Sequence, residues 1–126
     1  RVLFRSTAGS LDEAAECARK ASSVAQMHHE WGHLAYAHHL FANIASQMES
    51  PEQSRAQEYY EHALSRAVEL GMRPLEAHCH RGLGALAIGA GRMTQARVEL
   101  GTAVKMYREM NMNLWLPETT GMLLSI

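Results

Sequence analysis

The stretch HEWGHLAYAHH, residues 29–39, combines residue types and spacings that could bind zinc. His29, Glu30 and His33 follow the H-E-x-x-H pattern, and His39 stands where a third histidine ligand would complete a site. On a helix, residues i and i+4 share one face, so His29 and His33 could hold one Zn²⁺ while Glu30 activates its bound water. The stretch therefore raises the hypothesis of a zinc-dependent hydrolase.

The surrounding residues weaken the zinc hypothesis. The internal repeat described below aligns His29 with Gly71, so we expect the segment to span a turn and the first residues of a helix, with Gly32 helping to break it. The first two histidines of the motif would then not share a face. In metzincins, the H-E-x-x-H motif continues to a third histidine through a glycine that turns the chain towards this ligand. Tyr36 stands at the position of that glycine. We keep the hydrolase as the alternative hypothesis, with the same three histidines as ligands, and expect no cofactor.

Other reactive residues form no recognisable catalytic set. His78 and His80 in HCH point to different sides of a helix and cannot chelate one ion unaided, so we expect His80 to pack between helices and His78 to face a groove. Cys17 and Cys79 form no C-x-x-C motif, and we expect both to be reduced and buried. Asp12 is the single aspartate, and no G-x-x-x-x-G-K-[ST] phosphate loop occurs. We expect no enzyme.

Composition narrows the possible partners. The 126 residues include 12 Lys and Arg against 13 Asp and Glu, and this balance gives no electrostatic reason to expect nucleic acid or an anionic membrane. No apolar run approaches the ~20 residues of a bilayer span, so we expect a cytoplasmic protein.

Residues 1–6, RVLFRS, read like the translated end of a common sequencing adapter. We expect them to be non-native, and residues 7–126 to be one domain from a larger protein.

The helices predicted to carry these residues repeat along the chain. Alanine pairs seven residues apart, and therefore on one helical face, recur at spacings of 42 and 40 residues: Ala14 and Ala21, Ala56 and Ala63, Ala96 and Ala103. LFANIA (40–45) also matches GLGALA (82–87). Small residues such as Gly84 allow antiparallel helices to approach closely, while large ones such as Leu100 fill the space beside them. Such a period is typical of a helical solenoid.

Start and stop signals divide the repeats into helices. SLDE (10–13) and SPEQ (50–53) resemble capping boxes, and Gly71 and GAGR (89–92) are typical of helix ends. We expect helices at 11–28, 32–48, 51–70, 74–89 and 93–110, a weak one at 114–125, and no strand. The tail after Pro117 should be weakly held because PETTG has a poor helix propensity. The predicted fold is all-α: a solenoid of antiparallel helix pairs with about three repeats of 40–42 residues.

The segment GLGALAIGAGRMTQARVELGTAV resembles the tetratricopeptide repeat. Its matching positions are Leu83, Gly84, Ala96, Leu100 and Ala103. It departs from the motif at His80, Ala87 and Arg108, where the repeat favours Trp, Tyr and Pro. The period also exceeds the usual 34 residues, which indicates longer helices or loops.

A closer resemblance covers roughly residues 28–116. ELGMRPLEAHCHRGLG and MYREMNMNLWL are similar to the C-terminal repeats of large bacterial signalling proteins, in which a class III adenylate or guanylate cyclase domain and an ATPase module precede a tetratricopeptide tail. Neither catalytic module is present in this sequence. The resemblance implies an interaction or regulatory scaffold. Its partner would be a separate protein or peptide, or the upstream catalytic and ATPase domains of the same chain.

The resemblance also implies a binding surface. In tetratricopeptide arrays the first helix of each pair lines the concave face, and the register places there Tyr36, His39, Asn43 and Gln47 in one repeat, and His78 and Arg81 in the next. This polar surface, with Arg81 as its fixed cation, would suit a peptide with acidic or hydrogen-bonding groups. A purely solvated stripe, and hence a structural spacer, remains an alternative hypothesis.

Overall fold

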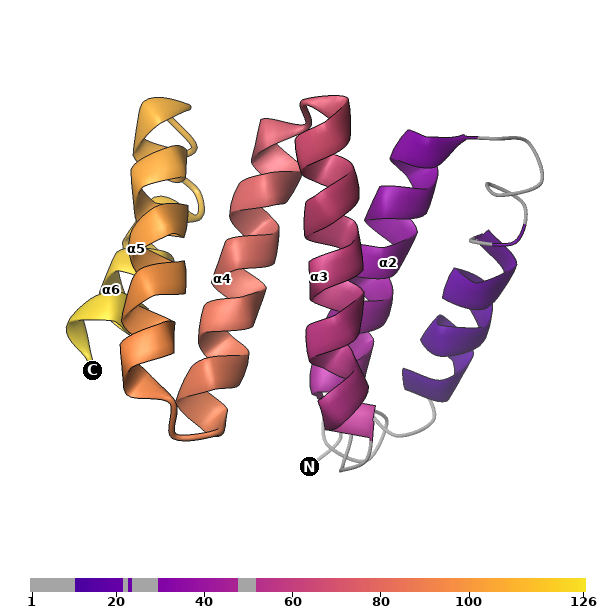
Figure 1. Cartoon of the computed structure of the whole chain (residues 1–126), viewed down its shortest axis with the longest axis horizontal. Coiled ribbons are helices and arrows are strands. Elements are labelled where there is room, and N and C mark those ends of the chain that lie inside the picture. The colour runs from indigo at the N-terminus through magenta and orange to yellow at the C-terminus, as the bar shows by residue number, and fades with distance from the viewer. Residues whose placement is uncertain (1–10, 22, 24–29, 48–51) are drawn as a thin grey trace. The chain divides into compact units, whose positions relative to one another are not determined.

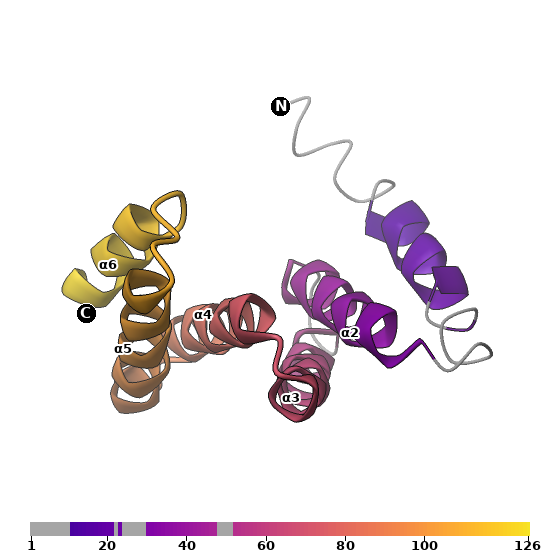
Figure 2. The ribbon, with the colours of Figure 1, turned by 90° about the horizontal axis from the view of Figure 1, so that it is seen from above.

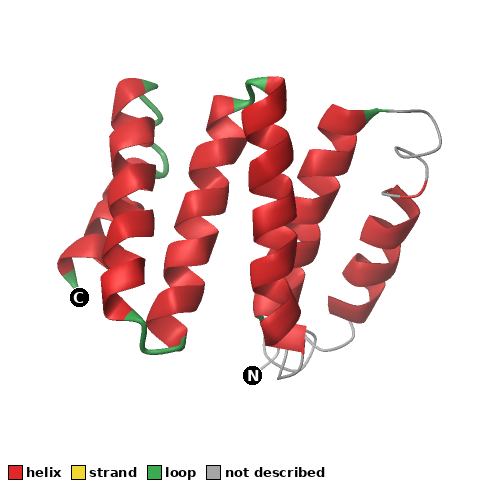
Figure 3. Cartoon of the chain, viewed as in Figure 1, coloured by secondary structure: helices red, strands yellow, loops and turns green. Residues whose placement is uncertain are grey.

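The computed structural model of the chain describes residues 11–21, 23, 30–47 and 52–126, with the side chains of 52–54 excepted. These residues form helices and turns, and no strand occurs among them (Figure 3). The helices are α2 (Trp31–Ser46), α3 (Glu52–Leu70), α4 (Arg73–Gly89), α5 (Met93–Glu109) and α6 (Leu116–Leu124), and residues 11–21 are helical as well. The predicted all-α class is confirmed, with the bounds of α2 to α5 within two residues of expectation. Residues 1–6 lie outside the described residues.

Three helices end in the same left-handed turn. Gly71, Gly91 and Asn111 have φ of 69°, 77° and 55°. At each, the next residue donates a backbone hydrogen bond five residues back, as from Met72 N to Ala67 O at 2.8 Å, which satisfies a carbonyl at the helix end. Gly71 and GAGR were predicted to end helices. Asn111 was missed, although asparagine also adopts this conformation readily.

The chain divides into two compact units, residues 1–66 and 67–126, and each is described by itself. In the first unit, α2 and α3 pair antiparallel. Trp31 at the start of α2 lies under the guanidinium of Arg66, 4.6 Å from its ring centroid. Phe41, near the end of α2, stacks on Tyr59 in the first half of α3, with ring centroids 5.2 Å apart. This reversed order of contacts defines the predicted helix pair.

The predicted alanine register holds in the later repeats and is wrong in the first. Ala56 and Ala63 are fully buried, as are Ala96 and Ala103. In the first helical segment, Ala14 is only partly buried and Ala21 is exposed. Ala15 and Ala18 are buried there instead, and they pack with Ile44 of α2. The segment is therefore turned by about one residue, or 100°, relative to the expected face.

In the second unit, α4 and α5 run side by side and are joined by the turn at Gly91 (Figure 1). Leu75, Leu100 and Tyr107 are completely buried in this pair. α6 packs beside α5 (Figure 2). No described helix has both the length and the apolar character needed to cross a membrane.

The C-terminal segment is held more firmly than its sequence indicates. Thr119 of α6 is fully buried, and its hydroxyl donates to the Trp115 carbonyl at 2.8 Å. Trp115 and Leu116 pack on the cluster that contains Met106 and Tyr107. The poor helix propensity of PETTG therefore does not prevent a helix here, because Thr119 is packed into the unit, while Leu124 further along is 80 % exposed.

Candidate functional site

The HEWGH segment is helical from its third residue. α2 begins at Trp31, with Glu30 at the N-cap, and Leu34 N donates to Glu30 O at 3.0 Å. Gly32 lies in the first turn, so the expectation that it helps to break the segment is wrong. Glycine costs a helix only about 1 kcal/mol relative to alanine, and the burial of Leu34 and Ala35 in the same turn outweighs that cost. His29 lies outside the described residues.

The remaining zinc-ligand candidates do not converge. His33 is exposed, and its Nδ1 lies 2.8 Å from Glu30 Oε2. His39 lies six residues further along α2, about 120° around the helix axis, and its ring packs edge-on against Tyr60 at 5.7 Å. Within the described ranges, no group of three or more His, Cys, Asp or Glu side chains is placed to hold a metal ion.

The predicted stripe on α2 is partly exposed and partly packed. Tyr36 is 51 % exposed and Gln47 is also exposed. Leu40, which the sequence analysis did not select, is 44 % exposed and lies one turn from Tyr36 on the same face. The sequence does contain a signal for Leu40, because a residue four positions after Tyr36 lies on the same face of a helix. The face of α2 defined by Tyr36, Leu40, Asn43 and Gln47 therefore presents apolar groups beside amides.

A core tyrosine orients the amide of Asn43. The Tyr60 hydroxyl donates to Asn43 Oδ1 at 2.5 Å, and Tyr60 is only 3 % exposed. Gln47 Nε2 donates to the Asn43 carbonyl at 3.4 Å, so it is anchored on the same turn. Because Oδ1 is engaged, the Nδ2 group of Asn43 is turned away from Tyr60 and is positioned to donate elsewhere.

A pair of histidines links α2 and α3. The rings of His38 and His62 lie 5.7 Å apart, and His38 Nδ1 is buried without a hydrogen-bond partner among the described residues. Burial lowers the pKa of His38, and the charges of His62 and Arg66 lower it further. The folded protein therefore favours a neutral His38. The sequence analysis did not foresee this pair.

In the second unit, His78 is packed rather than facing an open groove. Its Nδ1 lies 2.6 Å from the Tyr107 hydroxyl, and its ring meets Trp115 edge-on at 4.9 Å. Burial raises the pKa of Tyr107 to about 12, so the phenol remains protonated, and the tautomer of His78 decides which of the two groups donates. Burial also lowers the pKa of His78, with a smaller contribution from the charge of Arg81. His80 packs between helices as expected, with Nδ1 2.7 Å from Glu99 Oε1.

Arg81, expected as the fixed cation of a binding surface, is paired within its own unit. Its guanidinium forms an ion pair with Glu118 of α6, and the Arg81 side chain is 33 % exposed. Its Nε atom is buried without a partner among the described residues. The charge of Arg81 is therefore largely compensated within the second unit, because α6 packs where the sequence pattern placed an open surface.

The two cysteines differ in exposure. Both are free thiols; Cys79 is buried, as expected, while Cys17 is exposed, contrary to expectation. Burial raises the pKa of the Cys79 thiol to about 12. At neutral pH this thiol is protonated and therefore a poor nucleophile.

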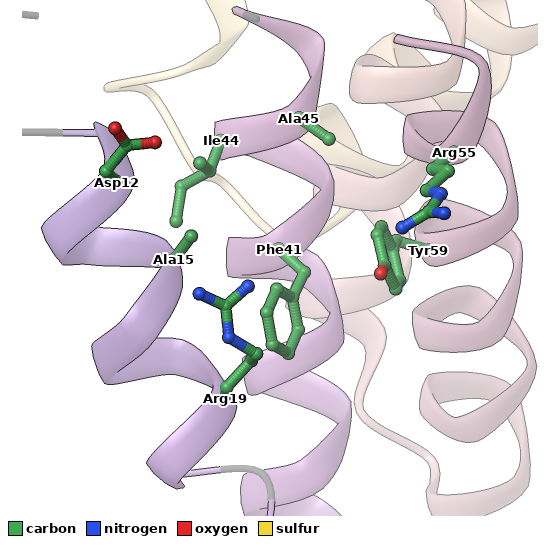
Figure 4. A pocket seen from close by; sticks show the side chains of 8 residues that line it. All are labelled: Asp12, Ala15, Arg19, Phe41, Ile44, Ala45, Arg55 and Tyr59. Atoms are coloured by element: carbon green, nitrogen blue, oxygen red, sulfur yellow. The ribbon is translucent and has the colours of Figure 1, made fainter. Parts of the chain in front are cut away.

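A cleft of about 340 Å³ lies within the first unit, between the helical segment 11–21, α2 and α3 (Figure 4). Its lining combines an apolar wall with three charged side chains: Asp12, Ala15, Arg19, Phe41, Ile44, Ala45, Arg55 and Tyr59. The sequence analysis missed this cleft. No local motif encodes it, because its residues come together only through the packing of three helices.

No protein-family model, curated protein or solved structure matches the chain. The resemblance to tetratricopeptide repeats therefore rests on its motif residues, and function has to be argued from the surfaces described above.

Proposed function

We propose that the chain is a protein-interaction module of the helical-repeat type that binds a partner segment on the exposed face of α2. The observation that carries this proposal is the exposure of Tyr36 (51 %) and Leu40 (44 %) one turn apart on that face. Exposed aromatic and aliphatic side chains flanked by oriented polar groups are typical of binding surfaces.

The chemistry of this face indicates its partner. Asn43 and Gln47 offer amide groups that can pair with a peptide backbone, and both are anchored on α2 or α3. Tyr36 and Leu40 can cover an apolar side chain of the partner. A segment with one or two apolar anchors and backbone groups free for hydrogen bonding therefore suits this face.

The resemblance to bacterial signalling proteins suggests the kind of larger protein to which this module belongs. In a bacterial signalling or regulatory protein, the partner would be another protein or the upstream catalytic and ATPase domains of the same chain. The role is that of a cytoplasmic scaffold without catalytic activity of its own. Two other functions remain as alternatives: a structural spacer, and a zinc-dependent hydrolase built on His29, His33 and His39.

Site-specific photo-crosslinking tests the proposal. A benzoylphenylalanine in place of Tyr36 should capture a defined protein from a lysate of the source cells, and an excess of unlabelled wild-type chain should compete it away. A Leu40→Glu competitor should fail. Val98 on α5 is 64 % exposed, so a Val98→Glu competitor is the matched control and should compete like wild type. Equal competition by both variants would reject the α2 face as the binding site and favour the spacer.

A further inference from the structure

We propose that the cleft of the first unit binds the C-terminal carboxylate of a peptide whose last residue is apolar. This cleft, whose lining residues are labelled in Figure 4, shares no residue with the α2 face of the proposed function. Its volume of about 340 Å³ lies at the lower end of the range of ligand pockets, roughly 300–1,000 Å³. It suits the end of a chain better than a long segment.

The apolar wall of the cleft is built from a stacked aromatic pair. Phe41 and Tyr59 lie with centroids 5.2 Å apart and ring planes 21° apart. Ile44 and Ala45 extend the same wall along α2. Each ring is only partly buried, so contact area remains for an apolar side chain. Removing such a surface from water favours binding.

The two arginines of the cleft differ in whether their guanidinium groups are already paired. Arg19 is engaged by Glu16 of its own helix, at 2.9 Å. Arg55 is exposed and forms no hydrogen bond or ion pair with another described side chain. A guanidinium beside an apolar wall favours a planar, bidentate anion such as a carboxylate. Arg55 is therefore the group that would hold the chain end.

Asp12 completes the arrangement. Figure 4 shows Asp12 and Arg55 at opposite ends of the lining, with Phe41 and Ile44 between them. An ionised carboxylate only accepts hydrogen bonds, so Asp12 would receive a peptide N–H of the incoming chain and repel a second anion. A ligand with a carboxylate at one end, an apolar side chain in the middle and an N–H at the other end matches this order.

The binding experiment uses acetyl-Gly-Leu-Phe with a free carboxylate as the probe, titrated into the full chain and followed by NMR of the Phe41 and Tyr59 ring protons. We expect saturable shifts of these signals. The same peptide with a C-terminal amide should bind at least about 10-fold more weakly, which corresponds to ~1.4 kcal/mol. Arg55→Gln should reduce binding of the free acid to the level of the amide, and Arg97→Gln, at an exposed arginine of α5, should have no effect.

Several results would overturn the inference. Equal affinities for acid and amide would remove the role of the carboxylate. An unchanged affinity in Arg55→Gln, with helicity by circular dichroism like wild type, would remove the role of Arg55. Binding of 3-phenylpropanoate as tight as that of the peptide would show a site for small organic acids rather than for a peptide end. The α2 face plays no part in these titrations, so their failure would leave the proposed function standing.

Discussion

The backbone of α4 at Gly84 lies directly against the side chain of Leu100 on α5. A Cβ atom added to Gly84 would stand 2.6 Å from two carbon atoms of that leucine, closer than atoms can pack. Leu100 is fully buried, so it has little room to withdraw. The glycine therefore sets the distance between the two helices, as its place in the repeat pattern predicts.

Substitution of this glycine tests the close approach. We expect Gly84→Ala to lower the free energy of unfolding by ~1–3 kcal/mol through overpacking, less the ~0.5–1 kcal/mol that alanine gains in a helix. Gly101, inside α5, has nothing within 4 Å of its added Cβ, so Gly101→Ala should be neutral or stabilising. Urea unfolding of both variants measures the difference. Equal stabilities would argue against close packing at Gly84.

Local signals were sufficient for the helices and insufficient for the surfaces. Gly71 and Gly91 could be predicted as helix ends because their conformational freedom is a property of the residue itself. The burial of Ala96 and Ala103 followed from spacing on one helix. The pairing of Arg81 with Glu118 could not be foreseen, because these residues stand 37 positions apart and meet only when α6 packs.

The same limit applies to the candidate sites. Tyr36 was selected from the repeat register and is exposed, while His78 was selected in the same way and is packed against Trp115. A register gives the direction of a side chain on its own helix. It does not say which neighbouring helix covers that side chain. The cleft beside Phe41 and Tyr59 depends on three helices and left no local trace in the sequence.

The hydrogen bond between Tyr107 and His78 should contribute measurably to stability. Tyr107→Phe removes the hydroxyl that lies 2.6 Å from His78 Nδ1, and with it this hydrogen bond of a half-buried ring. We expect a loss of ~1–3 kcal/mol in the free energy of unfolding. Tyr36→Phe, at an exposed position, is the control and should change stability by less than about 0.5 kcal/mol. Similar small effects in both variants would mean that the hydrogen bond adds little.

Acidification should destabilise the protein through His38. Its folded-state pKa is lowered from 6.5, mainly by burial, so below pH 6.5 the unfolded chain binds more protons than the folded one. The free energy of unfolding should therefore fall as the pH drops from 6.5 towards the lowered value. His78 acts in the same direction.

Replacement of His38 measures how much this residue contributes to the loss of stability at acidic pH. His38→Leu removes the titrating ring, and its Nδ1 has no hydrogen-bond partner among the described residues to lose. Urea unfolding at pH 7.5 and 5.5 should show a smaller loss of stability in this variant than in wild type. His33→Leu, at an exposed position, should retain the wild-type loss. A His38→Leu variant with an undiminished loss would contradict this account.

Metal analysis addresses the zinc hypothesis directly. His33 and His39 point about 120° apart on α2, so we expect purified protein to contain no stoichiometric zinc and to show no peptidase activity. Elemental analysis after dialysis measures the content. One tightly held zinc per chain, lost in His33→Ala, would contradict this expectation, and peptidase activity lost in the same variant would establish the hydrolase alternative.

Charge reversal at Arg81 should loosen α6 rather than act on a partner. Arg81→Glu would place its carboxylate beside that of Glu118, replacing an attraction with a repulsion. Because the Glu118 side chain is 61 % exposed, we expect a loss of only about 1 kcal/mol in the free energy of unfolding. The double variant Arg81→Glu with Glu118→Arg should recover part of this loss, since it restores opposite charges.

Hydrogen exchange of the α6 amides should be faster in the single variant and slower again in the double one. If exchange in α6 were unaffected by either variant, the ion pair would not hold this helix, and Arg81 would again be a candidate for binding an acidic partner.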